Sequence, residues 1–332
     1  MAELLCPSYE VTVGSEKYSE AKGQELVNAR FARNMGLPID RAEVLLVGAR
    51  KHSFKKGDAV KAKIGYGDTL QPIFSGLIDN VEQNLSTVKV TALGLAVQLL
   101  RLKLNRVYLN QTAGKITTNL AQEAKLKTKK ITEGINLPMY VVDEASNAFD
   151  HILELAKRCD FNTYFTEDGE LVFQESGGGK NTPLQYGKEI IRVEATDFSP
   201  LYKGTRICGE SPASTKGADT SHWLTKQEVK GEAGAATVLP LEDAAIRDKK
   251  TAEIVAKARM TPLCSTRGAV VDIVGRPELK LGDTVTLNDI PISDLEGELE
   301  IRSFEHYVSK ARGFTTTVSC WKRENRGGES TP

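Results

Sequence analysis

The stretch Leu281-Gly282-Asp283-Thr284-Val285 decides the fold, because it has a counterpart near the N-terminus, Lys56-Gly57-Asp58-Ala59-Val60. In both places the Gly-Asp pair precedes a run of alternating apolar and polar residues. Glycine tolerates a positive φ and aspartate caps its own backbone, so the pair suits a tight turn before a strand. The sequence therefore indicates an internal repeat of a β unit. The alternative is that antiparallel barrels in general use such turns.

The segments around each copy alternate in short runs that end at turn residues, which predicts strands. Around the first copy these strands are expected at 10–13, 43–47, 59–64, 73–81 and 86–92. Around the second copy they are expected at 190–196, 202–208, 268–274, 283–287, 298–308 and 314–320. Short strands at near-regular spacing favour a barrel or sandwich in each region.

Between the two copies the apolar period becomes helical. Apolar residues at helical spacing predict helices over 116–124 and 149–159, with Thr112 and Ser146 as N-caps. Asp168-Gly169 lies between two alternating segments and predicts a β-hairpin. This region is expected to form a small α+β unit.

The sequence thus predicts an α+β fold that is mainly β, with two related antiparallel β-barrel domains and a small α+β domain between them. The expected domains are residues 1–105, 106–182 and 183–332. Within them we expect a linker at 176–183, an exposed loop at about 209–234, a helix at about 241–259 that stops at Thr261-Pro262, and a polar C-terminal tail from Lys322.

Composition excludes several classes of protein. The 332 residues contain 44 Lys+Arg and 44 Asp+Glu, so the formal net charge is zero, and 40% of the residues are hydrophobic. These values exclude a disordered chain and a globally basic nucleic-acid binder. Residues 1–7 lack the basic and apolar regions of a signal peptide, so synthesis in the cytoplasm is expected.

No motif for catalysis, a cofactor or a metal is recognised. Gly177-Gly178-Gly179-Lys180 lacks the earlier glycine and the following Ser or Thr of a phosphate-binding loop. The five cysteines and four histidines are scattered, which favours reduced thiols over a disulfide framework. His306 is interpreted as a structural histidine. The basic run 125–130 is interpreted as a solvated helix end.

The segment 275–285, with its continuation at 297–307 and 313–317, resembles the late control D family of phage tail proteins, also called baseplate hub proteins. Residues 57–76, and 148–156 followed by 168–173, resemble the same family. That family is related to the hub of T4-like phages and to the first half of the type VI secretion spike protein. The matching motifs are signatures of the fold, and they carry no catalytic residue.

The resemblance implies two tail-tube-like β-barrels in each chain and a homotrimer around a central channel. Three chains with two barrels each would supply six similar positions, and so could join a six-fold tail tube to a three-fold spike. Expected partners are the tube protein, other baseplate proteins and a separate spike protein, because no needle repeat follows the second copy. The expected location is the tail baseplate of a virion or a tail-like injection particle. Specific nucleic-acid binding and membrane insertion are not expected, although DNA would pass through the channel.

Two other functions stay open at this point: a carbohydrate-binding or accessory tail module, and a peptidoglycan hydrolase. Aromatic residues, at 6% and not clustered, argue against the first. The second would need a cleft with convergent acids or a metal site. The residues proposed for an interface between proteins are Phe304, His306, Tyr307, Phe314, Trp321, His222 and Trp223.

Overall fold

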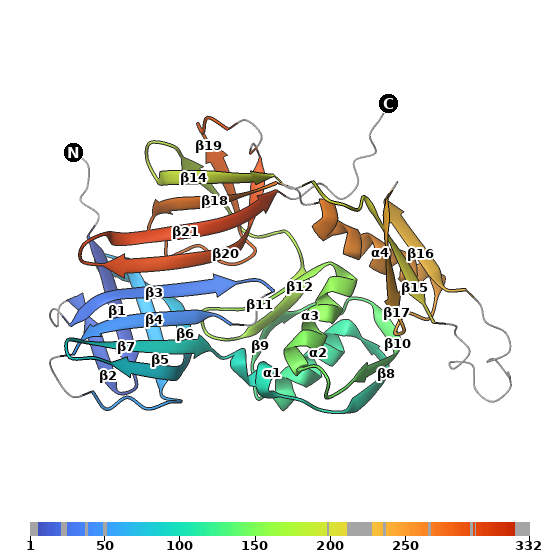
Figure 1. The fold of residues 1–332 in the computed structure, drawn as a ribbon, viewed down its shortest axis with the longest axis horizontal. Helices are drawn as coiled ribbons and strands as arrows, with labels where there is room; N and C mark the ends of the chain where they lie inside the picture. Colours follow the sequence, from blue (N-terminus) through green and yellow to red (C-terminus); the bar gives the residue numbers. More distant parts are fainter. Residues whose placement is uncertain are drawn as a thin grey trace.

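The computed structural model describes the chain from residue 6 to residue 322 with short gaps. The described ranges are 6–20, 25–36, 39–48, 52–197, 199–210, 228–234, 237–264, 267–292, 295 and 297–322. Long strands fill one end of the molecule, and the helices lie at the other end (Figure 1).

One large sheet is built from two halves that are far apart in the sequence. The first half contains β1 (Pro7–Val13), β2 (Glu16–Ser19), β3 (Leu26–Asn34), β4 (Arg41–Val47), β5 (Ala59–Tyr66), β6 (Thr69–Gln83) and β7 (Thr87–Gly94). The second half contains β13 (Asn181–Gln185), β14 (Ile190–Asp197), β18 (Arg267–Val274), β19 (Thr284–Asn288), β20 (Glu298–Ser309) and β21 (Gly313–Lys322). The strand order is β14-β18-β21-β20-β3-β4-β7-β6-β5-β1-β2, with β19 and β13 branching from β20.

Alternation along the strands places one face of this sheet in a core. In β21, Phe314, Thr316, Val318 and Cys320 are buried, whereas the residues between them are half-buried. Each half folds over its own apolar cluster, one around Phe31 and Val44 and the other around Val271 and Ile301. The prediction of a mainly β fold with two related β units is confirmed. The sequence did not anticipate that the two units form one hydrogen-bonded sheet.

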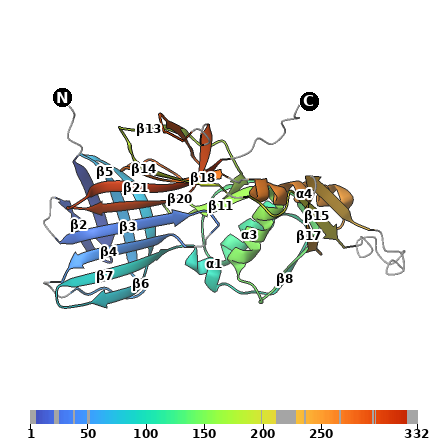
Figure 2. The same cartoon turned by 45° about the horizontal axis from the view of Figure 1, so that its top comes forward.

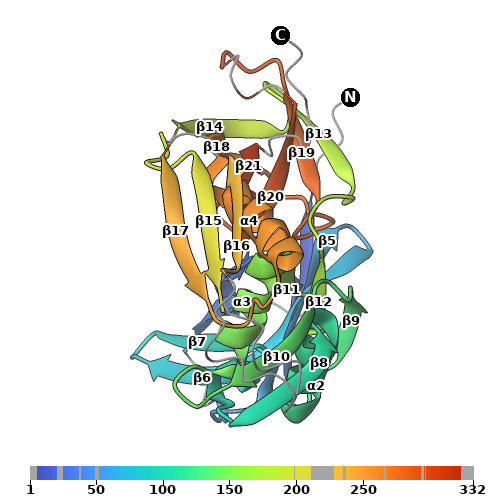
Figure 3. The ribbon, with the colours of Figure 1, turned by 90° about the vertical axis from the view of Figure 1, so that its right-hand side faces the viewer.

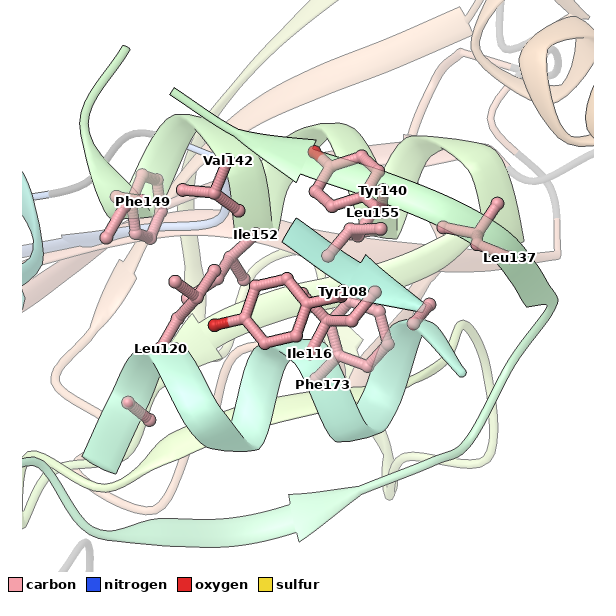
Figure 4. Close-up of a cluster of buried hydrophobic side chains, with 14 of the residues drawn as sticks. Tyr108, Ile116, Leu120, Leu137, Tyr140, Val142, Phe149, Ile152, Leu155 and Phe173 are labelled. Carbon is pink, nitrogen blue, oxygen red and sulfur yellow. The ribbon is translucent and has the colours of Figure 1, made fainter. Parts of the chain in front are cut away.

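The α+β unit follows the first half of the sheet. It contains α1 (Val97–Arg101), β8 (Arg106–Thr112), α2 (Ala113–Glu123), β9 (Thr128–Ile131), β10 (Asn136–Val142), α3 (Ala148–Cys159), β11 (Phe161–Phe165) and β12 (Leu171–Glu175). Its core packs α2 and α3 against Tyr108, Tyr140 and Phe173 (Figure 4). Thr112 caps α2 as predicted, by accepting the N–H of Lys115. The cap of α3 is Asn147 and not Ser146, because the Asn147 side chain accepts the N–H of Asp150 at 3.0 Å.

A further unit is inserted between β14 and β18. It contains β15 (Gly204–Gly209), β16 (Lys230–Gly234), β17 (Val238–Asp243) and α4 (Lys249–Cys264), and the three strands form their own sheet. Its apolar side chains Ile207, Ile246 and Val255 join the core of the α+β unit. Figures 2 and 3 show this insertion and the α+β unit side by side at the same end of the large sheet.

Three sequence predictions in this region are wrong in part. Residues 241–243 of the predicted helix belong to β17, because Leu241 pairs with Ile207 in a sheet. The helix begins after Asp248, whose carboxylate accepts the N–H of Thr251 at 2.8 Å, and it continues past Thr261 to Cys264. Residues 230–234 of the predicted loop form β16, while 211–227 lie outside the described residues.

Two shorter predictions also need correction. The linker predicted at 176–183 is shorter than expected, because β13 begins at Asn181 and pairs in parallel with β19. The basic run 125–130 is a helix end only at its start, because residues 128–131 form β9 against β12. Among the described residues, no helix is both long and apolar enough to cross a membrane.

Candidate assembly interface

The two halves of the large sheet meet along one internal joint. β20 pairs antiparallel with β3, with Ser303 opposite Asn34 at one end and Ser309 opposite Asn28 at the other. Tyr66 supports this joint, because its hydroxyl donates a hydrogen bond of 2.9 Å to the carbonyl of Gly275. The halves are therefore joined edge to edge by backbone hydrogen bonds.

The two Gly-Asp turns make the same hydrogen bonds, which confirms the internal repeat. Asp58 accepts the backbone N–H of Lys55 at 2.9 Å, and Asp283 accepts that of Lys280 at 3.2 Å. The preceding glycines both have positive φ, 91° at Gly57 and 84° at Gly282. In the first copy Gly57 and Asp58 exchange backbone bonds with Ile78, and in the second Gly282 and Asp283 exchange them with Ile301.

These turns yield a prediction about stability. Replacing Asp58 or Asp283 by alanine removes an acceptor of backbone N–H groups and should lower the free energy of unfolding by about 1–2 kcal/mol. The larger loss is expected at Asp283, because its other oxygen also accepts the N–H of Lys180 at 2.9 Å. Urea unfolding measures both, and the asparagine variants, which keep an acceptor oxygen, are the controls. Equal stability of D283A and the parent protein would contradict this account.

Bulges align the two halves residue by residue. In β3 the pairing with β4 shifts between Leu26 and Asn28, and in β14 the pairing with β18 shifts between Ile190 and Arg192. A second pair of shifts falls between Ile78 and Asn80 of β6 and between Ile301 and Ser303 of β20. Because a bulge changes the register at one defined residue, these shared bulges make β3, β4, β6 and β7 correspond to β14, β18, β20 and β21.

This correspondence identifies two edges that have no partner among the described residues. β20 uses its edge to bind β3, but the matching part of β6, from Asn80 to Gln83, pairs only with β7 on its other side. β14, which matches β3, has β18 as its one neighbouring strand in the described part of the chain. All residues of β14 from 191 to 197 are exposed except the half-buried Val193. Unpaired edges of this kind are ready to accept another strand.

The residues predicted for an interface lie in different environments. Phe304, His306 and Phe314 are buried, and the His306 ring lies 4.8 Å and 5.5 Å from the two phenylalanine rings between their centroids. Tyr307 and Trp321 are half-buried, and the guanidinium of Arg30 lies 5.2 Å from the Tyr307 ring. His222 and Trp223 lie outside the described residues. The structure thus brings three of the seven together inside the protomer, next to the internal joint.

His306 has the chemistry of a structural residue. Its Nδ1 lies 2.9 Å from the Thr316 hydroxyl. Burial, with a smaller contribution from the positive charge of Arg33, lowers the pKa of His306 to about 3. The ring is therefore neutral at physiological pH and contributes no charge to the joint.

A buried charge cluster, which the sequence did not reveal, joins both halves of the sheet to the α+β unit. Arg33 on β3 is 4% exposed, and its guanidinium lies 3.2 Å from the Asp40 carboxylate and 3.6 Å from that of Glu167. The guanidinium also donates to the carbonyl of Phe165. Glu167 in turn pairs with Lys280 of the second half at 2.7 Å. No spacing along the chain signals this cluster, because its members come from three separate regions.

A cavity of about 860 Å³ lies between β20, β21, α3 and α4. Its lining includes Asn162 and Arg302, and both contact the buried Glu300: the Glu300 carboxylate accepts the amide N–H of Asn162 at 2.7 Å and lies 2.8 Å from the guanidinium of Arg302. These contacts engage both oxygens of the acid in structural interactions. Among the described residues, no group of three or more His, Cys, Asp and Glu side chains is placed to hold a metal ion.

No protein-family model and no curated protein sequence matches this chain. Solved structures do match it along most of its length. The 43 kDa tail protein of prophage MuSo2 from Shewanella oneidensis superposes with a TM-score of 0.70 at 14% identity, covering 94% of this chain and 98% of that one. The tail protein from Neisseria meningitidis MC58 gives a TM-score of 0.70 at 13% identity, covering 96% and 97%. The chain has the fold of phage tail proteins.

The phage tail fold also extends to a secretion system. The c3393 protein of E. coli, described as a type VI secretion component with structural similarity to the T4 tail proteins gp27 and gp5, superposes with a TM-score of 0.60 at 10% identity. The match covers 91% of this chain and 74% of that one. The expected resemblance in fold to tail proteins is therefore confirmed.

Proposed function

We propose that this chain is a structural hub protein in the tail baseplate of a phage or of a tail-like injection system, without enzymatic activity. Three copies form a closed ring around a channel, and the ring connects a six-fold tail tube to a separate three-fold spike. Residues 1–105 and the barrel part of 183–332 supply the ring, and residues 106–182 supply an attached α+β unit. The particle is assembled after synthesis in the host cytoplasm.

One observation carries this proposal. The chain joins its second half to its first half through β20 and β3, and no other strand of the described residues pairs with the matching edges of β6 and β14. If β14 of one protomer binds β6 of the next as β3 binds β20, each protomer has one donor edge and one acceptor edge. Repetition of such a heterologous contact gives a ring when the rotation closes. Two halves in each of three chains then give six similar sheet segments.

The internal joint also predicts the register of the joint between protomers. His306 lies opposite Phe31 and Glu305 lies opposite Ala32. When β20 is aligned with β6 and β3 with β14 at the shared bulges, the first pair corresponds to Gln83 of one protomer opposite Ala195 of its neighbour. The second pair corresponds to Glu82 opposite Thr196 of the neighbour. Glu82 and Thr196 are both exposed in a single protomer.

Disulfide cross-linking tests this register. A protein with Glu82→Cys and Thr196→Cys, in a Cys6→Ser background, should form disulfide-linked dimers and closed trimers under mild oxidation. A disulfide within one protomer is excluded, because six strands lie between β6 and β14 in the sheet order and Figures 1 and 3 show the two strands on opposite sides of the protomer, whereas a disulfide needs Cα atoms within about 7 Å.

The matched control moves one cysteine along β14. Arg192 lies four residues from Thr196, roughly 13 Å along the strand. The pair Glu82→Cys with Arg192→Cys should therefore cross-link poorly. A ladder of products that continues beyond the trimer would contradict a closed ring, and equal cross-linking by both pairs would contradict the register.

A further inference from the structure

The connections between corresponding strands are alike in the two halves at one end of the large sheet and different at the other end. At the end away from the helices, both halves have similar connections: residues 84–86 join β6 to β7, and residues 310–312 join β20 to β21. At the other end, residues 35–40 join β3 to β4, but residues 198–266 join β14 to β18 and include the inserted unit. The α+β unit likewise follows β7 only. Figure 1 shows all of this extra structure at one end of the strands.

This difference has a consequence for symmetry. In a ring of three chains, the turns at the end away from the helices occur six times in similar form, because each chain supplies two. The extra structure at the helical end occurs only three times, once in each chain. A partner with six identical subunits needs six similar contacts, and a three-fold partner needs three. The end formed by the 84–86 and 310–312 turns is the one that matches a six-fold partner.

The same end carries an exposed aliphatic side chain at matching positions of both halves. Val27 in β3 and Ile191 in β14 are each the extra residue at a bulge, and they are 37% and 57% exposed. A bulge re-aims the extra side chain out of the regular pleat. Val47, which follows the bulge on the neighbouring strand, is 36% exposed, and Leu85 at the tip of the first turn is fully exposed.

The Leu85 turn is held in place by its own hydrogen bonds. The side-chain oxygen of Asn84 accepts the backbone N–H groups of Ser86 at 3.0 Å and of Thr87 at 2.7 Å. A turn fixed in this way presents its apolar side chain with little entropy left to lose on binding.

We infer that the bulge residues Val27 and Ile191 are the apolar anchor points by which this end of the ring binds a partner with six-fold symmetry, the terminal ring of the tail tube. This inference rests on the proposed hub function, and it assigns the tube to one end and leaves the helical end for the three-fold partner. In a trimer the three copies of Val27 and the three of Ile191 alternate around the rim. Each would enter an apolar socket on one tube subunit.

The test uses the full chain and, as probe, the purified tail-tube subunit of the same particle. Val27→Lys combined with Ile191→Lys should keep the native mass of the parent protein but weaken binding of the tube subunit at least about tenfold, because a charge replaces an anchor in an apolar socket. Val27→Thr combined with Ile191→Thr keeps the branched shape and the strand preference, and should give a smaller loss in the same direction.

The matched control lies at the opposite end. Val107 and Leu109 on β8 are 54% and 63% exposed. Their double lysine variant should bind the tube subunit within about twofold of the parent protein, since it changes an equally exposed aliphatic pair away from the anchors.

Three results would overturn the assignment. The first is a trimeric rim variant that binds the tube subunit as well as the parent protein does, and the second is loss of tube binding in the β8 control. The third, a parent protein that stays monomeric with and without the tube subunit and fails to cross-link through residues 82 and 196, would overturn the hub function itself. Native mass and cross-linking therefore separate the two failures.

Discussion

Replacing Ala195 by glutamate is expected to leave a folded protomer of 36.3 kDa under conditions in which we expect the parent protein to form the proposed trimer of about 109 kDa, three times that mass. Ala195 is exposed in the protomer, so the new carboxylate stays in water there. Its counterpart in the first half is Phe31, which lies opposite His306 of β20 and is fully buried in a core that also includes Val308 and Phe314 of the second half. In the ring the glutamate would be buried in the same way beside Gln83 of the next protomer.

The size of this effect follows from the cost of burying an unpaired charge. That cost is about 3–5 kcal/mol, and each 1.4 kcal/mol is a factor of about ten in affinity. Each joint should therefore weaken more than about a hundredfold. Native mass spectrometry and analytical ultracentrifugation measure the assembly, while thermal unfolding of the protomer should be unchanged.

Ala145→Glu is the matched control, because Ala145 is an exposed alanine in the connection before α3 and belongs to the α+β unit, not to either edge of the large sheet. It should assemble as the parent protein does. If A195E retains the trimer mass, β14 is not the edge that joins the protomers, and the register derived from the internal joint fails with it.

Replacing Arg33 by methionine should produce the largest loss of stability of any single substitution considered for this chain. Methionine keeps the apolar stem near Phe304, whose ring lies 5.7 Å from the guanidinium carbon. It removes the cation between Asp40 and Glu167 and the donor to Phe165. Breaking a buried ion pair by removal of one partner costs about 3–5 kcal/mol, because the remaining charge is left without compensation.

Most of the stability lost in R33M should come from Asp40, which is left without a compensating charge. Burial raises the pKa of Asp40, and Arg33 opposes this effect through its charge and its hydrogen bond. Without Arg33, Asp40 has lost the cation that favours its charged form, whereas Glu167 keeps Lys280 at 2.7 Å. Asp40→Asn should therefore recover part of the stability lost in R33M, which a double-mutant cycle by urea unfolding measures.

Arg30→Met on the same strand is the control for this substitution. The Arg30 side chain is 53% exposed and lies 3.9 Å from Glu305, so its removal should cost less than about 1 kcal/mol. A loss below about 1 kcal/mol in R33M as well would show that the charge cluster does not hold the two sheet halves to the α+β unit.

Alternation of apolar residues was sufficient to predict most strands and the mainly β class. The Gly-Asp turns were sufficient to predict the repeat, because a turn with positive φ depends on residues next to each other in the chain. Local signals failed where a distant strand decided the outcome. Residues 241–243 form a strand because β15 lies beside them, and Asn181 begins a strand because β19 does.

The candidate interface shows the same division. The sequence placed five of the seven interface residues near the end of the second copy, in β20, which forms the internal joint, and in the neighbouring β21, but three of those side chains are buried in the core. The free edges of β6 and β14 could not be found in this way, because an unpaired edge is defined by the absence of a neighbouring strand and not by a residue type.

By itself, the sequence determined the local structure: where strands turn, where α2 and α3 run, and that one β unit occurs twice. These depend on backbone preferences and on apolar periods that extend over a few residues. Only the tertiary structure decided that the two units share one sheet, that Arg33 is buried among groups from three regions, and that one pair of edges is joined while the matching pair has no partner strand among the described residues. Hydrogen bonds between distant strands and the burial of charge decide those features, because both depend on what lies beside a residue in space.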